Sequence, residues 1–130
     1  MTRRLALILL AFPGVAVAQT GDCINPVAQV ELTYCAEVAF QAADADLNAA
    51  YKAARAVLRD LDLNLPVAQR GAEAVLREAQ RSWIAFRDQA CKAEAYVWQG
   101  GSGQGMAYAG CRARLTNARA ADLWALGEGF

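Results

Sequence analysis

The sequence predicts an all-α protein: a small antiparallel bundle of three main helices and a short N-terminal helix, held by two disulfides. The chain is rich in alanine, leucine, arginine and glutamate and poor in β-branched residues, which is helical composition. Its apolar residues recur three, four or seven positions apart, as they do on one face of a helix. Four cysteines, an even number in a short exported chain, indicate disulfides: Cys23, Cys35, Cys91 and Cys111.

Export is indicated by the first 18 residues. Arg3 and Arg4 form a positive region, residues 5–17 are apolar, and residues 16–18 read A-V-A, a signal peptidase site. The apolar run is shorter than the roughly 20 residues of a membrane span. We therefore expect a signal peptide at residues 1–18 and a single domain at 19–130. The mature protein should be periplasmic or secreted, without stable membrane insertion.

A short leading helix is expected because Asn25 can cap it and Pro26 can open it. If one continuous helix began at Pro26, Cys35 would lie about 13.5 Å from Pro26 along the helix axis. The three residues back to Cys23 reach only about 10 Å, so the chain would have to run straight back along the helix. A turn near Thr33 makes the Cys23–Cys35 bridge easier, and we favour a helix–turn–helix.

Three apolar stripes then place the main helices. The first predicts a helix over about 34–60 from Phe40, Leu47, Tyr51, Ala54, Leu58 and Leu61. The second predicts a helix over about 67–99 from Leu76, Ala79, Trp83, Phe86, Ala90 and Val97. The third, which is weaker, predicts a helix over about 106–126 from Leu115, Ala118 and Leu126. Pro66 and a glycine-rich loop at 100–105 separate them, and Gly71 can delay the second helix.

The glycine loop also suggests the second disulfide. Cys91 lies nine residues before the loop and Cys111 six residues after it. On an antiparallel hairpin these offsets differ by about 4.5 Å, so a slight stagger would let the two cysteines bridge. Four cysteines allow three pairings; we favour Cys23–Cys35 with Cys91–Cys111.

Two sequence runs carry a family likeness. Residues 43–51 read A-D-x-x-L-N-x-x-Y, with Asp44, Leu47, Asn48 and Tyr51 at the marked positions. Residues 79–91 read A-Q-x-x-W-I-x-F-R-D-x-x-C, and their marked positions are Gln80, Trp83, Phe86, Arg87, Asp88 and Cys91. With the glycine loop, Cys111 and Arg119, the chain resembles the LprI-like lysozyme-inhibitor family of small exported bacterial helical domains. The resemblance implies a helical domain and inhibition of lysozyme.

Most of these marked residues have a structural interpretation. We expect Trp83 and Phe86 in the core, and Asn48, Tyr51 and Gln80 in hydrogen bonds between helices. Arg87 should be partly buried and paired with a carboxylate of another helix, Asp44 or Asp122. The adjacent Asp88 need not pair with it. The alternative places Arg87 on a partner-binding surface.

Several function classes are disfavoured. The chain has no histidine, the commonest general base and a frequent zinc ligand. Its net charge is 0, or −2 without Arg3 and Arg4, so the sequence gives no sign of a basic surface that would bind nucleic acid. The glycine loop lacks the lysine and Ser/Thr of a phosphate loop. Asp44, Asp46 and Asp88 fall on helices rather than on a calcium-binding loop. We expect no catalytic residue, cofactor or metal.

The glycine loop is the best candidate for contact with a protein partner, because loops on rigid scaffolds often carry recognition. Aromatic side chains, which interfaces favour, flank it. The candidate residues are Tyr96, Trp98, Gly101, Ser102, Gln104 and Tyr108. The alternative is a solvated connector whose aromatic residues cover the end of the bundle.

Three functions compete at this point. The leading hypothesis is a non-enzymatic binding protein that inhibits a lysozyme. The second is a structural or adaptor protein of the cell envelope or a secretion system, with no effect on lysozyme. The third, hydrolysis of cell-wall glycan by paired carboxylates, is disfavoured because Glu73, Glu78 and Glu94 have no matched partner in an obvious cleft.

Overall fold

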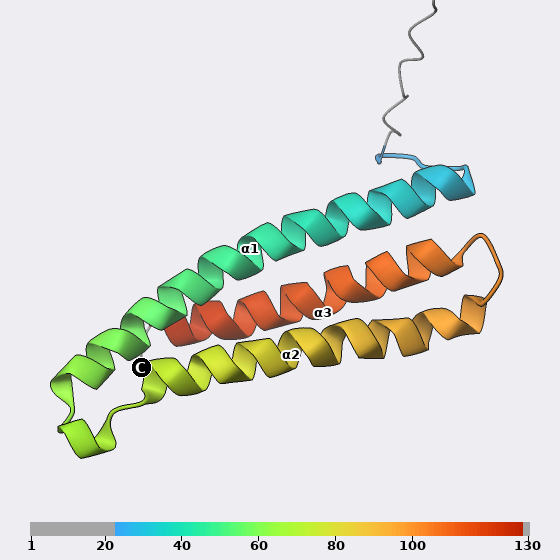
Figure 1. Ribbon diagram of the computed structural model, residues 1–130. Coiled ribbons are helices and arrows are strands. Elements are labelled where there is room, and N and C mark those ends of the chain that lie inside the picture. Colours follow the sequence, from blue (N-terminus) through green and yellow to red (C-terminus); the bar gives the residue numbers. More distant parts are fainter. Residues whose placement is uncertain (1–22, 129–130) are drawn as a thin grey trace, which may run out of the picture.

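The computed structural model describes residues 23–128 as three long helices packed side by side in up–down–up order (Figure 1). They are α1 (Gln29–Asn64), α2 (Ala72–Ala95) and α3 (Gln104–Gly127). Two single-turn 3₁₀ helices, η1 (Val67–Gln69) and η2 (Tyr96–Trp98), lie in the connections. The described residues contain no strand, so the all-α bundle is confirmed. The expected signal peptide lies outside the described residues.

α1 is continuous, and the expected leading helix with a turn near Thr33 is wrong. Helix formation begins only at Gln29, where the Glu31 carboxylate accepts hydrogen bonds from the backbone N–H groups of Val27 and Ala28. These bonds lower the pKa of Glu31. Cys35 thus lies only about 9 Å along the axis from the helix start. The non-helical residues before α1 can reach it, with 5.5 Å between the Cα atoms of Cys23 and Cys35.

The connection from α1 to α2 is fixed by a side-chain cap. Asp62 accepts hydrogen bonds of 2.9 to 3.1 Å from the backbone N–H groups of Gly71, Ala72 and Glu73. Together these N–H groups lower the pKa of Asp62. Gly71 has a φ of 146°, a conformation that favours glycine, and α2 begins directly after it. Gly71 therefore delays the second helix, as predicted.

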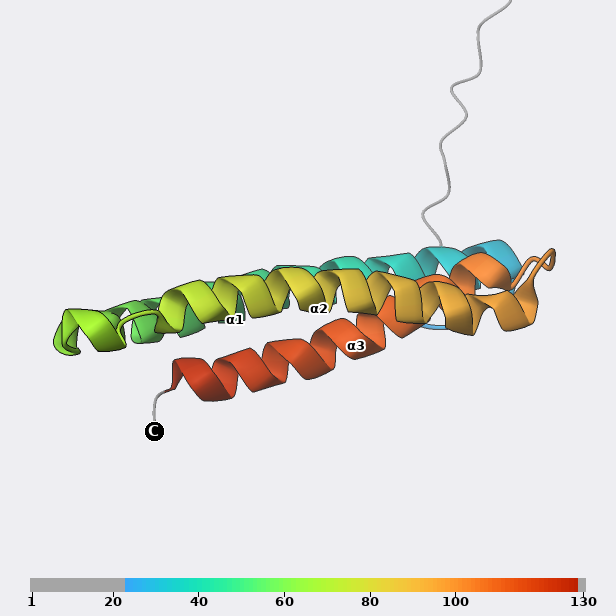
Figure 2. The same cartoon turned by 60° about the horizontal axis from the view of Figure 1, so that its bottom comes forward.

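The core is built largely from small side chains. One cluster joins all three helices and consists of Leu47, Ala50, Ala54, Leu76, Ala120 and Leu123. Alanines let α1 and α3 approach closely: a Cβ on Gly127 would lie 3.1 Å from the Cβ of Ala53. α1 and α3 share the largest interface, whereas α2 packs mainly on α3 and little on α1. Figure 2 shows the three helices from a second side.

The predicted stripes of α2 and α3 are right only in part: Leu76 is buried and Leu126 packs against the core cluster, but other members face solvent. Phe86 is 62% exposed, so its expected core position is wrong; Trp83 does pack against the core cluster. The inward positions of α2 are Leu76, Gln80, Arg87, Cys91 and Ala95. Polar residues take these positions because they find partners on α1 and α3. On α3 the predicted Ala118 is exposed, and the buried residues are Ala109, Cys111, Ala113, Thr116, Ala120 and Leu123.

Both predicted disulfides are present. The Cα atoms of Cys91 and Cys111 lie 5.4 Å apart, and this bridge joins the end of α2 to the first half of α3. The Cys23–Cys35 bridge lies at the start of α1, at the same end of the bundle as the α2–α3 loop (Figure 1). Among residues 23–128, no helix has the length and apolarity that crossing a membrane requires.

Candidate functional site

The predicted loop is an ordered turn between α2 and α3. η2 extends α2 by one turn, and the N–H of Gly101 donates to the carbonyl of Trp98 at 2.9 Å. Gly100 has a φ of 76°, which favours glycine. A Cβ on Gly103 would lie 3.2 Å from Cε3 of Trp98, so the chain passes directly under the indole ring. The glycines therefore serve a tight turn.

A hollow of about 680 Å³ lies between η2 and the start of α3. Its lining residues are Lys92, Ala95, Tyr96, Gln99, Gly101, Gln104, Gly105 and Tyr108. Four of the six predicted candidates line this hollow, and Trp98 and Ser102 do not. Lys92, Ala95 and Gln99 were not predicted, although Lys92 lies one turn before Tyr96 and thus on the same helix face.

The hollow combines polar groups with aromatic rings. Nε2 of Gln104 donates to Oε1 of Gln99 at 2.7 Å. Lys92 forms no ion pair within the described part of the chain. Tyr96 is exposed, whereas Tyr108 is half-buried with the Arg112 guanidinium carbon 5.0 Å from its ring centroid. The site offers amide and phenol groups, one cation and two rings.

Three consecutive apolar side chains on η2 face solvent. Tyr96, Val97 and Trp98 are 67%, 83% and 52% exposed, and we call them the η2 turn surface. The segment before α1 and the first turn of α1, at the same end of the molecule (Figure 1), add exposed Ile24, Val27 and Val30. Exposed apolar side chains also lie at the other end of the bundle, among them Leu63 and Val67, but within the described residues only the η2 turn surface has three in consecutive positions. Such a contiguous group is typical of an interaction surface.

Away from this end, Arg87 lies inside the bundle with its side chain only 6% exposed. Its Nη1 lies 3.5 Å from Oδ1 of Asp44 on α1 and donates to Oγ1 of Thr116 on α3. The expected pairing with Asp44 is confirmed. Its Nε also donates to Oδ1 of the adjacent Asp88 at 2.9 Å, a pairing that the sequence did not predict. Burial removes Arg87 from any partner-binding surface.

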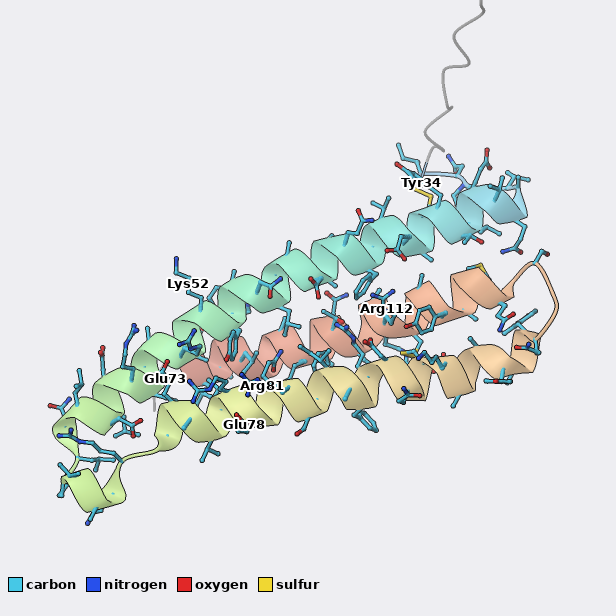
Figure 3. All side chains as sticks on the ribbon, in the orientation of Figure 1. Tyr34, Lys52, Glu73, Glu78, Arg81 and Arg112 are labelled. Carbon is cyan, nitrogen blue, oxygen red and sulfur yellow. A yellow bond between two sulfur atoms is a disulfide. The ribbon has the colours of Figure 1, made fainter. Side chains whose placement is uncertain are left out.

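Arg112 completes this layer of charge. Its guanidinium carbon lies 3.5 Å from the ring centroid of Phe40, and its Nε lies 3.8 Å from Oδ1 of Asp88. Figure 3 labels Arg112 on α3, between the ribbons of α1 and α2 in that view. We call Arg87, Arg112, Asp44 and Asp88 the arginine layer. It links the three helices at mid-length.

The other family-motif residues that were expected to join helices differ in their contacts. Gln80 accepts a hydrogen bond from Nε of Arg119 at 3.1 Å, which joins α2 to α3 as expected. Tyr51 packs against the core cluster, with the guanidinium carbon of Arg55 5.7 Å from its ring centroid. It makes no hydrogen bond to another helix of the described residues, so that expectation is wrong. Asn48 is exposed and donates to Asp44 within α1, so its expected bond between helices is wrong.

No paired carboxylates face each other across the hollow. Glu73 pairs with Arg55, Glu78 with Arg81 and Glu94 with Arg114. Figure 3 shows Glu73 and Glu78 along α2, toward the end of the bundle away from the loop. Among residues 23–128 there is also no group of three or more side chains suited to hold a metal ion. The lining of the hollow contains neither an aspartate nor a glutamate.

Comparison with known proteins gives consistent matches over most of the chain. A family model described as "Lysozyme inhibitor LprI" matches residues 23–123. An uncharacterized protein of Rhizobium meliloti (strain 1021) is 37% identical over 125 residues, which are 94% of this chain and 90% of that protein. The crystal structure of a DUF1311 family protein from Pseudomonas putida KT2440 superposes with a TM-score of 0.67 and 27% identity. It covers 77% of this chain and 94% of its own.

Proposed function

Because this chain belongs to the LprI family of lysozyme inhibitors, we propose that it is an exported, non-enzymatic binding protein that inhibits a lysozyme. The observation that carries the proposal is the η2 turn surface. Three adjacent apolar side chains, two of them aromatic, face solvent beside a buried disulfide. Aromatic residues of this kind contribute most of the binding energy at protein interfaces.

The scaffold behind this surface supports the proposal. The Cys91–Cys111 bridge ties together the two helices from which the turn projects. A surface that is already ordered loses less conformational entropy on binding, so more of the contact energy appears as affinity. The tight passage of Gly103 under Trp98 orders the turn further.

The proposed mechanism is steric. The η2 turn surface projects from one end of an elongated bundle (Figure 1) and docks on the substrate cleft of the enzyme. Glycan is then excluded, and no covalent step is required. The pairing of Glu73, Glu78 and Glu94 with arginines agrees with a role without catalysis.

A lysis assay with the purified, disulfide-bonded protein tests this function. Bacterial cells are exposed to lysozymes of several types with increasing amounts of the protein. We expect lysis to slow. Trp98→Ala or Val97→Glu should weaken inhibition by about 30-fold, the effect of losing an interface residue worth 2 kcal/mol. Phe86→Ala, which removes another exposed aromatic ring from α2, away from the loop, is the matched control.

No slowing of lysis at a large molar excess, against every lysozyme type tried, would contradict inhibition. It would favour the second candidate, a structural or adaptor protein of the cell envelope or a secretion system. A separate apolar stripe supports that candidate: Val30, Tyr34 and Val38 lie one turn apart on α1 and are exposed. Co-purification of a bacterial envelope protein, with lysozyme untouched, would establish it.

We also propose that residues 1–18 are removed on export and that residues 19–130 form one domain in the periplasm or outside the cell. The two disulfides support an oxidising compartment. The mature protein should begin at Gln19, which N-terminal sequencing of exported material will test. A mature protein that still begins at Met1 would contradict the cleavage.

A further inference from the structure

We propose that the hollow between η2 and α3 binds a saccharide, namely an amino-sugar glycan that carries a carboxylate. This is the chemistry of bacterial cell-wall glycan. The inference goes beyond the proposed function, because the ligand here is the substrate of a lysozyme rather than the enzyme. Its residues are largely distinct from the η2 turn surface, of which only Tyr96 also lines the hollow.

The size and walls of the hollow suit a sugar. Its volume of about 680 Å³ falls within the range of roughly 300–1,000 Å³ typical of small-molecule sites. Tyr96, Tyr108 and Ala95 supply apolar surface for the C–H faces of a pyranose ring. Each tyrosine also has a hydroxyl group, so one side chain offers both an apolar face and a polar tip.

The polar groups match sugar hydroxyls, each of which both donates and accepts hydrogen bonds. A single hydrogen bond joins Gln104 to Gln99. It leaves Nε2 of Gln99 and Oε1 of Gln104 without a hydrogen-bond partner among the described residues. Each side chain thus keeps one unused group, a donor on Gln99 and an acceptor on Gln104. An acetamido group or a pair of ring hydroxyls requires this combination.

The charge of the hollow selects an acidic sugar. Lys92 is its one charged lining residue, and no aspartate or glutamate lines it. An exposed ammonium group without an ion pair attracts a carboxylate, and the attraction weakens as salt is added. The lack of a lining carboxylate also means binding without hydrolysis, which requires two.

The disulfide makes the hollow a preformed site. Cys91 directly precedes Lys92 on one wall, and Cys111 lies three residues after Tyr108 on the other. The bridge between them fixes the spacing of the two walls. The competing occupant is a side chain of a protein partner, and the experiment below separates the two.

The test is a titration of the ¹⁵N-labelled, disulfide-bonded protein with two soluble disaccharides. One joins N-acetylglucosamine to N-acetylmuramic acid, and the other is the neutral N,N′-diacetylchitobiose. We expect the amide signals of Lys92, Tyr96, Gln104 and Tyr108 to shift at millimolar sugar, with the acidic sugar bound more tightly. Gln104→Ala should weaken both sugars about tenfold, and Lys92→Gln should abolish the preference for the acidic one.

Variants separate this site from the surface proposed to bind lysozyme. Val97→Glu should leave sugar binding intact, and Phe86→Ala should change neither property. Each variant is first shown to have an unchanged unfolding midpoint. The proposal is overturned if neither sugar moves the signals of the hollow. It is also overturned if lysozyme alone moves them and Lys92→Gln weakens only inhibition, because the hollow would then receive a protein side chain.

Discussion

Arg87 shows how one charged residue organises the middle of this bundle. Its guanidinium carbon lies 5.2 Å from the ring centroid of Phe40 and 5.3 Å from that of Trp83, while its N–H groups reach Asp44 and Asp88. A planar guanidinium suits this site because it stacks on aromatic faces and donates in its own plane. The interaction fixes the register of α1 against α2, two helices that otherwise share little surface.

Replacing Arg87 gives the first prediction. Arg87→Ala should lower the free energy of unfolding by about 2–4 kcal/mol, since breaking a buried ion pair costs about 3–5 kcal/mol. The expected loss lies below the full cost because the side chains of Asp44 and Asp88 are 43% and 34% exposed. Water can therefore solvate their carboxylates once the arginine is gone. Arg87→Met breaks the same ion pair but keeps most of the volume, so it should cost less than Arg87→Ala by the cavity that alanine leaves. Urea unfolding measures both.

The control is Arg81→Ala, because the Arg81–Glu78 pair is exposed and should contribute less than about 1 kcal/mol. Equal losses for Arg87→Ala and Arg81→Ala would show that the arginine layer has no special role in stability.

Asp62 gives a pH-dependent prediction. Its pKa is lowered in the folded protein, so its contribution to stability is complete above the ordinary carboxyl pKa of about 4. That contribution is lost as the pH falls through the lower pKa of the folded state. Asp62→Ala should therefore lower the urea midpoint most near neutral pH, and the difference from wild type should shrink below about pH 4.

Asp60→Ala is the matched control for Asp62→Ala, since the Asp60 carboxylate makes no hydrogen bond or ion pair with the described residues. It should show no such pH dependence. A difference between wild type and Asp62→Ala that stays constant from pH 7 to pH 2 would contradict the capping role.

At this scale the sequence predicted a carboxylate partner for Arg87, with Asp44 as one of two candidates, but it misplaced Phe86. A single chain shows which residues are apolar, and α2 has apolar residues on two adjacent faces. The face that turns inward is decided by partners on other helices, such as Thr116 for Arg87 and Arg119 for Gln80. Those partners lie 29 and 39 residues away, beyond any local periodicity.

At the scale of elements, the connections between helices were easier to predict than the point at which a helix begins. Pro66, Gly71 and the glycine loop mark chain reversals by their own backbone preferences, and the structure places both connections there. The start of α1 depended on Glu31 reaching back to Val27, a contact that composition does not reveal. Four residues that line the hollow were predicted as contact residues, because aromatic side chains flank the loop. Lys92 was not among them.

The two disulfides should differ in their effect on stability. Loops of 12 and 20 residues give about 3 kcal/mol each in the chain-entropy model. Cys91 and Cys111 are also buried in the core, whereas Cys23 is exposed. Cys91→Ala with Cys111→Ala should therefore lower the free energy of unfolding more than Cys23→Ala with Cys35→Ala. Urea unfolding under oxidising conditions measures both, and the opposite order would contradict the argument.

The whole molecule has two unlike ends. At the loop end lie both disulfides, the η2 turn surface and the hollow, whereas the other end has the Asp62 cap and the Arg55–Glu73 ion pair (Figures 1 and 3). Covalent links stabilise an end at which Tyr96, Val97 and Trp98 face water instead of packing into a core. Such an arrangement frees those side chains for binding, because the fold there does not depend on burying them.

The same asymmetry predicts how the bundle opens. α1 and α3 enclose fully buried Ala50, Ala54 and Ala120, whereas α2 packs little on α1 and turns Gln80 and Arg87 inward. Native-state hydrogen exchange should therefore show lower opening free energies for amides at 76–86 of α2 than at 47–57 of α1 or 113–123 of α3. Protection should rise along α2 toward Cys91, where the disulfide joins it to α3.

Reduction of the disulfides gives the internal control for this opening. Without the Cys91–Cys111 bridge, the protection near Cys91 should fall to the level of the rest of α2, while the α1–α3 pair keeps its order of protection. Equal protection of all three helices in the oxidised protein would show a single cooperative unit. In that case the arginine layer would bind α2 as firmly as the alanine-rich contact binds α1 to α3.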